Sequence, residues 1–264
     1  MPFVKINGRR IEYQKIDAST PSAPTLVFLH EGLGSIALWR DFPARVAAAT
    51  NCAALIYSRY GYGASEKLAA PRGVRYMHEE ALETLPALLA EFGIADPVLI
   101  GHSDGASIAL IHAGARRWPV RGLVLEAPHV FVEDVTVTSI VGAKEAWLTT
   151  ELRQRLARYH DDVDGAFVGW NDIWLHPDFR TWNIEEVLPR IDVPVMVIQG
   201  ADDEYGTPAQ LHAIERQIRG PVELLLLQDC KHSPHRDQPE ATLAAIARFV
   251  ASYGTNSSAT QDSA

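Results

Sequence analysis

The sequence predicts an α/β fold in which a mostly parallel, eight-stranded sheet carries helices on both faces. Short apolar runs rich in β-branched residues alternate with longer segments of helical periodicity, and this alternation is typical of βαβ units. The chain opens with two short runs separated by Asn7-Gly8, a residue pair that favours a tight hairpin turn. One long segment, residues 131–190, interrupts the alternation.

The predicted strands are short and follow one another at regular intervals. The opening hairpin comprises residues 3–6 and 10–16. Six more strands are predicted at residues 25–30, 53–58, 97–102, 121–126, 193–199 and 222–227. Helical periodicity between them is clearest at residues 76–92 and 241–253. Because parallel strands deliver the residues that follow them to one edge of the sheet, we expect the active side chains directly after these strands.

Residues 131–190 are too long for a plain βα connection, and we expect them to form a helical cap inserted after the sixth strand. Residues 1–130 and 191–254 would form the core, and residues 255–264 a flexible tail. Within the cap, residues 143–159 have helical periodicity. The segment holds four of the six tryptophans: Trp147, Trp170, Trp174 and Trp182. Each taken alone is expected to pack within the cap, but together they favour an aromatic-lined pocket beneath it.

Composition excludes several classes of protein. The 264 residues suffice for one large α/β domain with an insertion, and 47% apolar residues exclude general disorder. A net charge of −9 argues against a nucleic-acid partner. The N-terminus lacks a basic region followed by an apolar stretch, and the apolar runs are shorter than the ~20 residues that span a bilayer. We therefore expect a cytoplasmic protein without a membrane partner, and the two cysteines, Cys52 and Cys230, agree with a reducing compartment.

The most informative motif is Gly-x-Ser-x-Gly at residues 101–105, which lies between a predicted strand and a helix-like stretch. Glycines on both sides of Ser103 suit a sharp turn that presents the hydroxyl above the sheet. The following helix would aim free main-chain N–H groups at the same point, which favours developing negative charge. An ordinary βα loop with a glycine-flanked serine is the alternative, and the rest of the chain decides between the two.

A serine becomes a good nucleophile when a histidine takes its proton and a carboxylate orients that histidine. Asp203 follows the strand at 193–199, and His232 follows the strand at 222–227. The order serine, aspartate, histidine along the chain is typical of one hydrolase architecture and not of chymotrypsin-like or subtilisin-like enzymes. Glu126, at the end of the sixth strand, is a second candidate for the acid.

Four local patterns resemble those of the α/β-hydrolase superfamily, and the resemblance covers nearly the whole chain. His-Glu-Gly-Leu-Gly at 30–34 resembles the family's oxyanion loop, and residues 59–65 resemble its Arg-Gly-x-Gly-x-Ser turn. Residues 200–203 resemble the family's Gly-x-x-Asp, and residues 231–235 its Gly-His-x-Pro-His. The resemblance implies an α/β-hydrolase fold with a catalytic triad of Ser103, Asp203 and His232. It also implies that Asp203, rather than Asp202, is the acid.

The resemblance also implies an oxyanion hole, and two residues depart from the family pattern near it. The main-chain N–H groups of Gly32 and Asp104 are the expected donors, with Leu33 as a further candidate. Glu31 and Lys231 stand where the family usually has glycine. A carboxylate at position 31 would repel the anion that the hole stabilises. Glu31 is therefore expected either to pair with a cation such as Arg59 or to bind a polar or cationic group of the substrate.

The candidate pocket residues come from the cap and from the loops after the strands. They are Glu31, His129, Phe131, Trp170, Trp174, Trp182, Tyr205 and His235. His232 and His235, with Asp237 nearby, are also possible metal ligands, but no third well-spaced ligand follows and we predict no metal site.

These observations predict a serine hydrolase that cleaves a small carboxylic ester through an acyl-enzyme and requires no cofactor. The substrate is expected to be a small molecule, apolar or aromatic. The same triad serves lactonases, thioesterases and hydrolases of C–C bonds, and the sequence does not separate these activities. Outside enzymes, some relatives use the fold as a ligand-binding receptor or scaffold.

Overall fold

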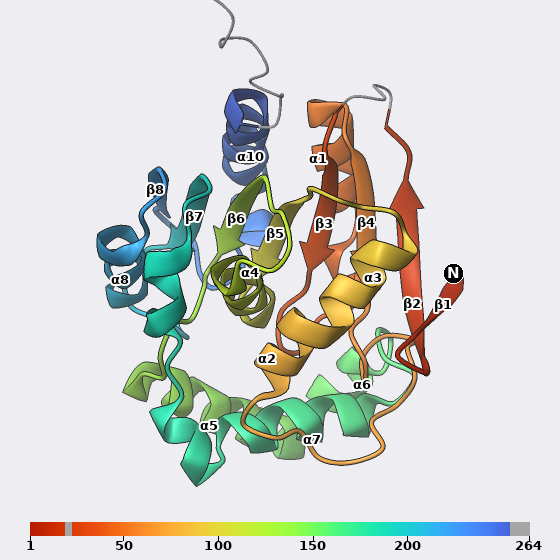
Figure 1. Cartoon of the computed structure of the whole chain (residues 1–264). Coiled ribbons are helices and arrows are strands. Elements are labelled where there is room, and N and C mark those ends of the chain that lie inside the picture. Colours follow the sequence, from red (N-terminus) through yellow and green to blue (C-terminus); the bar gives the residue numbers. More distant parts are fainter. Residues whose placement is uncertain (19–22, 254–264) are drawn as a thin grey trace, which may run out of the picture.

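The computed structural model describes residues 1–18 and 23–253 and contains one eight-stranded sheet (Figure 1). The strands are β1 (Phe3–Ile6), β2 (Arg9–Ile16), β3 (Thr25–Leu29), β4 (Ala53–Tyr57), β5 (Val98–His102), β6 (Gly122–Glu126), β7 (Val195–Gly200) and β8 (Val222–Leu227). Their order in the sheet is β1-β2-β4-β3-β5-β6-β7-β8. Strand β2 runs antiparallel to both neighbours, and the pairings from β4 to β8 are parallel. The predicted fold class and the eight strands are confirmed.

Helices cover both faces of the sheet. They are α1 (Phe42–Thr50), α2 (Tyr76–Glu79), α3 (Leu85–Glu91), α4 (Asp104–Ala115), α5 (Asp134–Thr149), α6 (Leu152–Leu156), α7 (Val163–Trp174), α8 (Ala209–Gln217), α9 (Pro234–Asp237) and α10 (Pro239–Tyr253). Side chains of β3 alternate between two buried clusters, one shared with α1 and α10 and the other with α3, α4 and α8. This alternation is the period of two that a strand imposes.

Two predicted helices differ from the observed ones. The predicted helix at 76–92 is divided by a π-helical turn at Glu80–Thr84, which precedes Pro86, a residue without an N–H to donate. The predicted helix at 143–159 is interrupted, because its first part belongs to α5, which begins at Asp134 and gives way to extended backbone at Thr150, and its second part contains the short helix α6. The hydroxyls of Thr149 and Thr150 donate to carbonyls one turn back, a pattern that competes with helix continuation.

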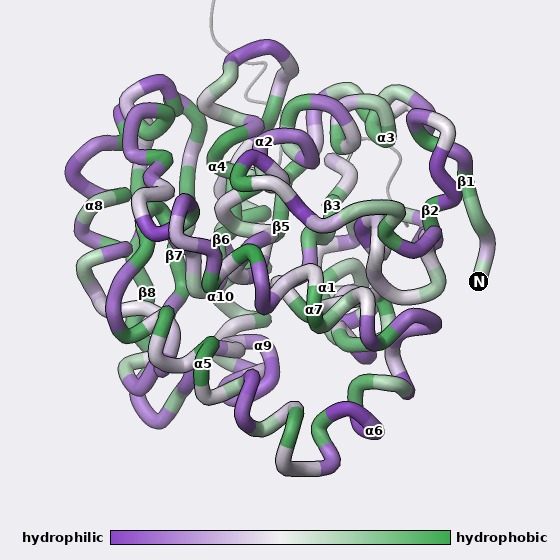
Figure 2. Tube along the Cα trace, turned by 90° about the horizontal axis from the view of Figure 1, so that it is seen from below, coloured by the Kyte–Doolittle hydropathy of each residue, from purple (hydrophilic) through white to green (hydrophobic). Residues whose placement is uncertain are grey.

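The long insertion lies at one end of the sheet. Helices α5, α6 and α7 lie below the strands in Figure 1, and Asn171 of α7 donates to the carbonyl of Ile140 in α5 at 3.0 Å. Seen from this end, α6 lies at the edge of the molecule (Figure 2), and none of its residues is buried. The 3₁₀ helix η4 (Glu185–Arg190) packs back onto α4 and α8.

The division into core and cap stays a prediction, and the tail predicted at 255–264 lies outside the described residues. No helix in the described ranges combines the length and the apolar character needed to cross a membrane.

Candidate active site

Ser103 lies in a strained turn between β5 and α4. Its backbone φ of 53° and ψ of −116° are values that few non-glycine residues adopt and that often mark functional sites. A Cβ on Gly105 would overlap the carbonyl of Leu29 in β3, and a Cβ on Gly101 would overlap the carbonyl of Gly105. Both motif glycines are therefore required by close backbone approach, and the turn presents the serine at the carboxyl edge of the sheet.

His232 connects Ser103 to Asp203. Its Nε2 lies 2.9 Å from Ser103 Oγ, and its Nδ1 lies 2.8 Å from Asp203 Oδ1. The three side chains come from the loops after β5, β7 and β8, so the sheet brings together the residues that the sequence predicted. This arrangement allows the imidazole to accept the serine proton while the carboxylate holds the tautomer with a proton on Nδ1.

Asp203 is held as a carboxylate in a fixed orientation. It accepts hydrogen bonds from the N–H groups of Tyr205 at 2.8 Å and Gly206 at 3.3 Å, and from the Gln199 amide at 3.2 Å. Burial favours a higher pKa, but His232 and the Tyr205 N–H outweigh it, and the pKa of Asp203 lies below its usual value. The charged form therefore persists at neutral pH.

Asp202 and Glu126, the two alternatives to Asp203 as the partner of His232, have different surroundings. Asp202 is exposed. The Glu126 carboxylate is completely buried and accepts the Nδ1–H of His235 at 2.8 Å and its main-chain N–H at 3.1 Å. Among the described residues, the Glu126 carboxylate therefore has recorded hydrogen bonds with His235 and none with His232.

The predicted oxyanion donors line one wall of the cavity at Ser103. Among the described residues, no acceptor is recorded for the main-chain N–H of Gly32, Leu33 or Asp104, and all three residues border this cavity. The loop is fixed because the Glu31 carbonyl accepts from Gly34 N–H at 3.0 Å and from a His30 ring N–H at 2.7 Å. Unpaired donors on a fixed loop suit an anion that forms during reaction.

The side chain of Asp104 makes contacts that the sequence did not predict. It is buried and accepts hydrogen bonds from the Tyr76 hydroxyl at 2.7 Å and the Trp174 indole at 3.3 Å. The guanidinium of Arg59, which is also buried, lies 3.5 Å from the same carboxylate. Trp174 therefore links the insertion directly to the residue after the serine.

The predicted ion pair between Glu31 and Arg59 is wrong, because Arg59 Nη2 donates to the main-chain carbonyl of Glu31 at 2.8 Å instead. The Glu31 carboxylate faces His102 Nδ1 at 3.5 Å. His102 Nε2 lies 2.7 Å from the carbonyl of His232, and since a carbonyl only accepts, this nitrogen carries a proton. A carboxylate at Nδ1 favours a second proton on the same ring.

The Glu31 carboxylate and the His102 imidazole therefore each favour the charged form of the other. Burial opposes the charge on Glu31, but His102 outweighs it and holds the pKa of Glu31 far below its usual value. Burial likewise opposes the charge on His102, but Glu31 outweighs it and raises the pKa of His102. The negative charge beside the oxyanion donors is thus balanced, which removes the expected repulsion of an anion.

The cavity at Ser103 has a volume of about 110 Å³. Five of the predicted pocket residues line it: Glu31, His129, Trp170, Trp174 and Tyr205. The sequence missed four further residues that line it: His102, Thr136, Ile140 and Ser233. Thr136 and Ile140 lie in no motif, whereas His102 and Ser233 adjoin Ser103 and His232 at positions for which no pocket role was predicted.

Three predicted pocket residues lie elsewhere. Phe131 forms a β-bridge with Asn183. Trp182 stacks on Phe179 with ring centroids 5.4 Å apart, and His235 packs 4.6 Å from Trp39. Trp182 and His235 are buried against these neighbours, Phe131 is half-buried, and none of the three lines the cavity at Ser103, so the prediction for these three is corrected.

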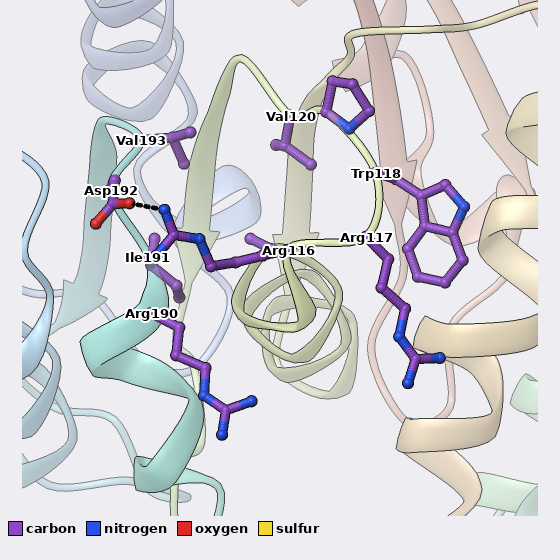
Figure 3. Close-up of a pocket in the computed structure, with 10 residues that line it drawn as sticks. Arg116, Arg117, Trp118, Val120, Arg190, Ile191, Asp192 and Val193 are labelled. Carbon is purple, nitrogen blue, oxygen red and sulfur yellow. Dashed lines mark hydrogen bonds and ion pairs between the residues drawn. The ribbon is translucent and has the colours of Figure 1, made fainter.

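A larger cavity of about 440 Å³ lies at the other end of the sheet (Figure 3). It borders the segments that precede β6 and β7, and its walls include Arg117, Trp118 and Arg190, as well as Arg116 paired with Asp192. Because Ser103 follows the carboxyl end of β5, and β5 to β7 are parallel, this cavity is remote from the serine. It contains no pair of nucleophile and base, so the smaller cavity is the candidate site.

Fold and site define an α/β protein with a serine held in a strained strand-to-helix turn, and comparison with known proteins identifies its family. Residues 26–246 match the model of the alpha/beta hydrolase family, and the chain belongs to that family. One curated relative is a 2-succinyl-6-hydroxy-2,4-cyclohexadiene-1-carboxylate synthase of Enterobacter sp. strain 638, which is 24% identical over 89% of this chain and 95% of the relative. Another is the 2-heptyl-3-hydroxy-4-quinolone dioxygenase AqdC2 of Rhodococcus erythropolis, which is 30% identical over 52% of this chain and 47% of the relative.

Solved structures show the same fold. The enol-lactonase from Burkholderia xenovorans LB400 aligns with a TM-score of 0.74 at 22% identity, over 95% of this chain and all of that one. A proline iminopeptidase from Mycobacterium smegmatis aligns with the same TM-score at 18% identity, over 96% of this chain and 98% of that one. The names of these proteins describe different reactions, so the fold does not determine the reaction of this chain.

Proposed function

We propose that this protein is a serine hydrolase that cleaves a small carboxylic ester through an acyl-enzyme. The observation that carries the proposal is the position of His232, 2.9 Å from Ser103 Oγ and 2.8 Å from Asp203, at the wall of a cavity. Nucleophile, base and orienting acid within hydrogen-bond reach are the geometry of nucleophilic acyl transfer.

In the first half of the reaction, His232 Nε2 takes the proton of Ser103 as Oγ attacks the ester carbonyl. The carbonyl oxygen becomes an oxyanion that the N–H groups of Gly32 and Asp104 would stabilise, with Leu33 as a further donor. Loss of one such donor typically costs about 3–4 kcal/mol of transition-state stabilisation. The tetrahedral intermediate collapses, and the leaving alcohol receives the proton from His232.

In the second half, His232 removes a proton from water, and the hydroxide attacks the acyl carbonyl. Collapse breaks the bond to Ser103 Oγ, which regains its proton from His232, and the acid is released. Every step uses only groups of the chain, water and substrate, so we propose no cofactor. The aromatic walls formed by Trp170 and Trp174 suit a small apolar or aromatic substrate.

The same geometry would also open a lactone, cleave a thioester or hydrolyse a C–C bond, and a receptor on this fold would bind without turnover. A panel of short aryl esters, thioesters and lactones distinguishes the first three of these activities, with Ser103→Ala as the matched control. We expect turnover of the aryl esters that is lost in Ser103→Ala. Turnover that persists in the variant would contradict the nucleophile, and a folded wild-type protein that turns over no member would leave C–C bond hydrolysis or a receptor.

A further inference from the structure

His129 is a buried histidine whose ring lacks a protein partner at one nitrogen. It follows β6 and is 2% exposed. Its carbonyl accepts the hydroxyl of Ser107 at 2.6 Å, which fixes the backbone, but its Nδ1 has no hydrogen-bond partner among the described residues. A buried polar group left unpaired costs about 1–3 kcal/mol, so this histidine is not explained by the stability of the fold.

The ring lies beside the reacting groups. It lines the cavity at Ser103, with its centroid 5.6 Å from that of His232 and 5.2 Å from that of Trp174. Strand β5 lies between β3 and β6 in the sheet. His129, which follows β6, therefore faces the serine from the opposite side to Gly32, which follows β3. A substrate whose carbonyl oxygen points to Gly32 would extend another of its groups toward His129.

The charge of His129 limits what it can bind. Burial, together with the positive charge of a protonated His232, lowers the pKa of His129 to about 3, and Asp203 opposes this shift only in part. The imidazole is therefore neutral near pH 7 and offers one N–H donor and one acceptor nitrogen. A neutral imidazole lacks the charge that gives strong carboxylate binding, but it can pair with a hydroxyl or a carbonyl oxygen.

We propose that His129 determines specificity by hydrogen-bonding a hydroxyl or oxo oxygen of the substrate, so that the substrates are short hydroxy- or oxo-esters. This inference rests on the proposed esterase function. The cavity of about 110 Å³ is far below the roughly 300–1,000 Å³ of typical ligand sites, which restricts the bound group to a short chain. A site that hydrogen-bonds a substrate oxygen rejects the analogue that lacks it, because its polar group is then left unpaired.

Pairs of esters that differ only in this oxygen provide the test. One pair varies the acyl group, 4-nitrophenyl lactate against 4-nitrophenyl propionate, and a second varies the alcohol, 2-hydroxyethyl propionate against ethyl propionate. We expect kcat/KM of the wild-type protein to favour the hydroxylated member of one pair by roughly 10- to 100-fold. In His129→Phe the ratio should fall close to one, whatever the change in the absolute rates, and His129→Asn should retain part of the preference.

His112→Phe is the matched control. His112 is also buried, and its Nε2 likewise has no hydrogen-bond partner among the described residues. Its ring contacts the Ala81 carbonyl at 2.8 Å and stacks on Trp118, away from the serine. Its replacement should leave the selectivity ratio unchanged. The inference is overturned if the wild-type ratios are near one, or if His129→Phe keeps the wild-type ratio, while ester turnover still depends on Ser103. Absence of ester turnover in the wild-type protein would instead overturn the esterase proposal and this inference with it.

Discussion

Two carboxylate–histidine pairs lie near each other in this molecule, and only one faces a serine. Asp203 and His232 are joined at 2.8 Å, and Glu126 and His235 are joined at the same distance. The ring of His102 lies 5.2 Å from His232 and 5.0 Å from His235. The two pairs thus have the same local geometry and share a neighbour.

The difference lies at the other ring nitrogen. His232 Nε2 faces the hydroxyl of Ser103, whereas the ring of His235 packs 4.6 Å from Trp39 and 5.5 Å from Phe42 and its side chain is only 3% exposed. A carboxylate–imidazole contact is therefore compatible with either a catalytic or a structural role. What the second nitrogen faces distinguishes the two, and the following variants test this distinction.

The largest effect is expected for the pair that faces the serine. Ser103→Ala and His232→Ala should each lower kcat by roughly 10⁴- to 10⁶-fold, and the double variant should be barely worse than either single variant, because these residues act as one unit. Steady-state kinetics on one activated aryl ester measures all three proteins. Losses that multiply in the double variant would show that the two residues act independently.

A direct contrast comes from the two acids. Asp203→Asn should lower kcat by about 10⁴-fold with the melting temperature little changed, because the imidazole loses its correct tautomer. Glu126→Gln should leave kcat nearly unchanged and lower the free energy of unfolding by about 1–3 kcal/mol, because a buried charge-assisted contact is weakened. Asp202→Asn, at an exposed position, is the control for both measurements. The opposite ranking would assign the acid to Glu126.

A third carboxylate–histidine pair, Glu31 and His102, is expected to act through stability and with a defined pH dependence. The pKa of Glu31 is lowered from 4.5, so its contribution is present above that pH and is lost as the pH falls through its folded pKa. The pKa of His102 is raised from 6.5, so its contribution is complete below that pH and is lost as the pH rises through its folded pKa.

The difference in unfolding free energy between the wild-type protein and Glu31→Gln should therefore be largest between about pH 4.5 and 6.5. This difference should decrease as the pH rises above that range. Denaturant titrations across pH measure this difference. The turnover rates of different neutral esters should all change by the same factor in Glu31→Gln. A constant difference at all pH values would contradict the charged pair, and a rate loss confined to substrates with a donor or positive charge would favour a substrate contact.

The sequence predicted the strands and the meeting of Ser103, Asp203 and His232 because each carries a local signal. Alternating apolar runs identify the strands, and glycines and prolines mark the turns that carry Ser103 and His232. The partner of Glu31 has no such signal, since His102 is distant in sequence and becomes its neighbour only because β3 pairs with β5. The cap gave the poorest predictions, because the direction of Phe131 or Trp182 depends on how its helices pack, and an aromatic side chain suits a helix interface as well as a pocket.

The smallest expected effect compares two tryptophans of this insertion. Trp174 and Trp182 are both buried with ring centroids 6.3 Å apart, but only the indole N–H of Trp174 has a recorded partner, Asp104, while that of Trp182 has none in the described structure. Trp174→Phe should therefore lower the unfolding free energy by about 1 kcal/mol more than Trp182→Phe, because loss of the Trp174 indole leaves a carboxylate oxygen of Asp104 without this hydrogen bond.

Kinetics should separate the same two variants. Trp174 lines the cavity and Trp182 does not, so Trp174→Phe should raise KM for bulky esters several-fold with little change for a minimal acetyl ester, and Trp182→Phe should alter neither. Loss of binding that is equal in ground state and transition state raises KM without lowering kcat. Calorimetry and the two-ester comparison on the same protein samples measure both effects. Equal changes in the two variants would show that the contact with Asp104 does not distinguish a pocket tryptophan from one that only packs.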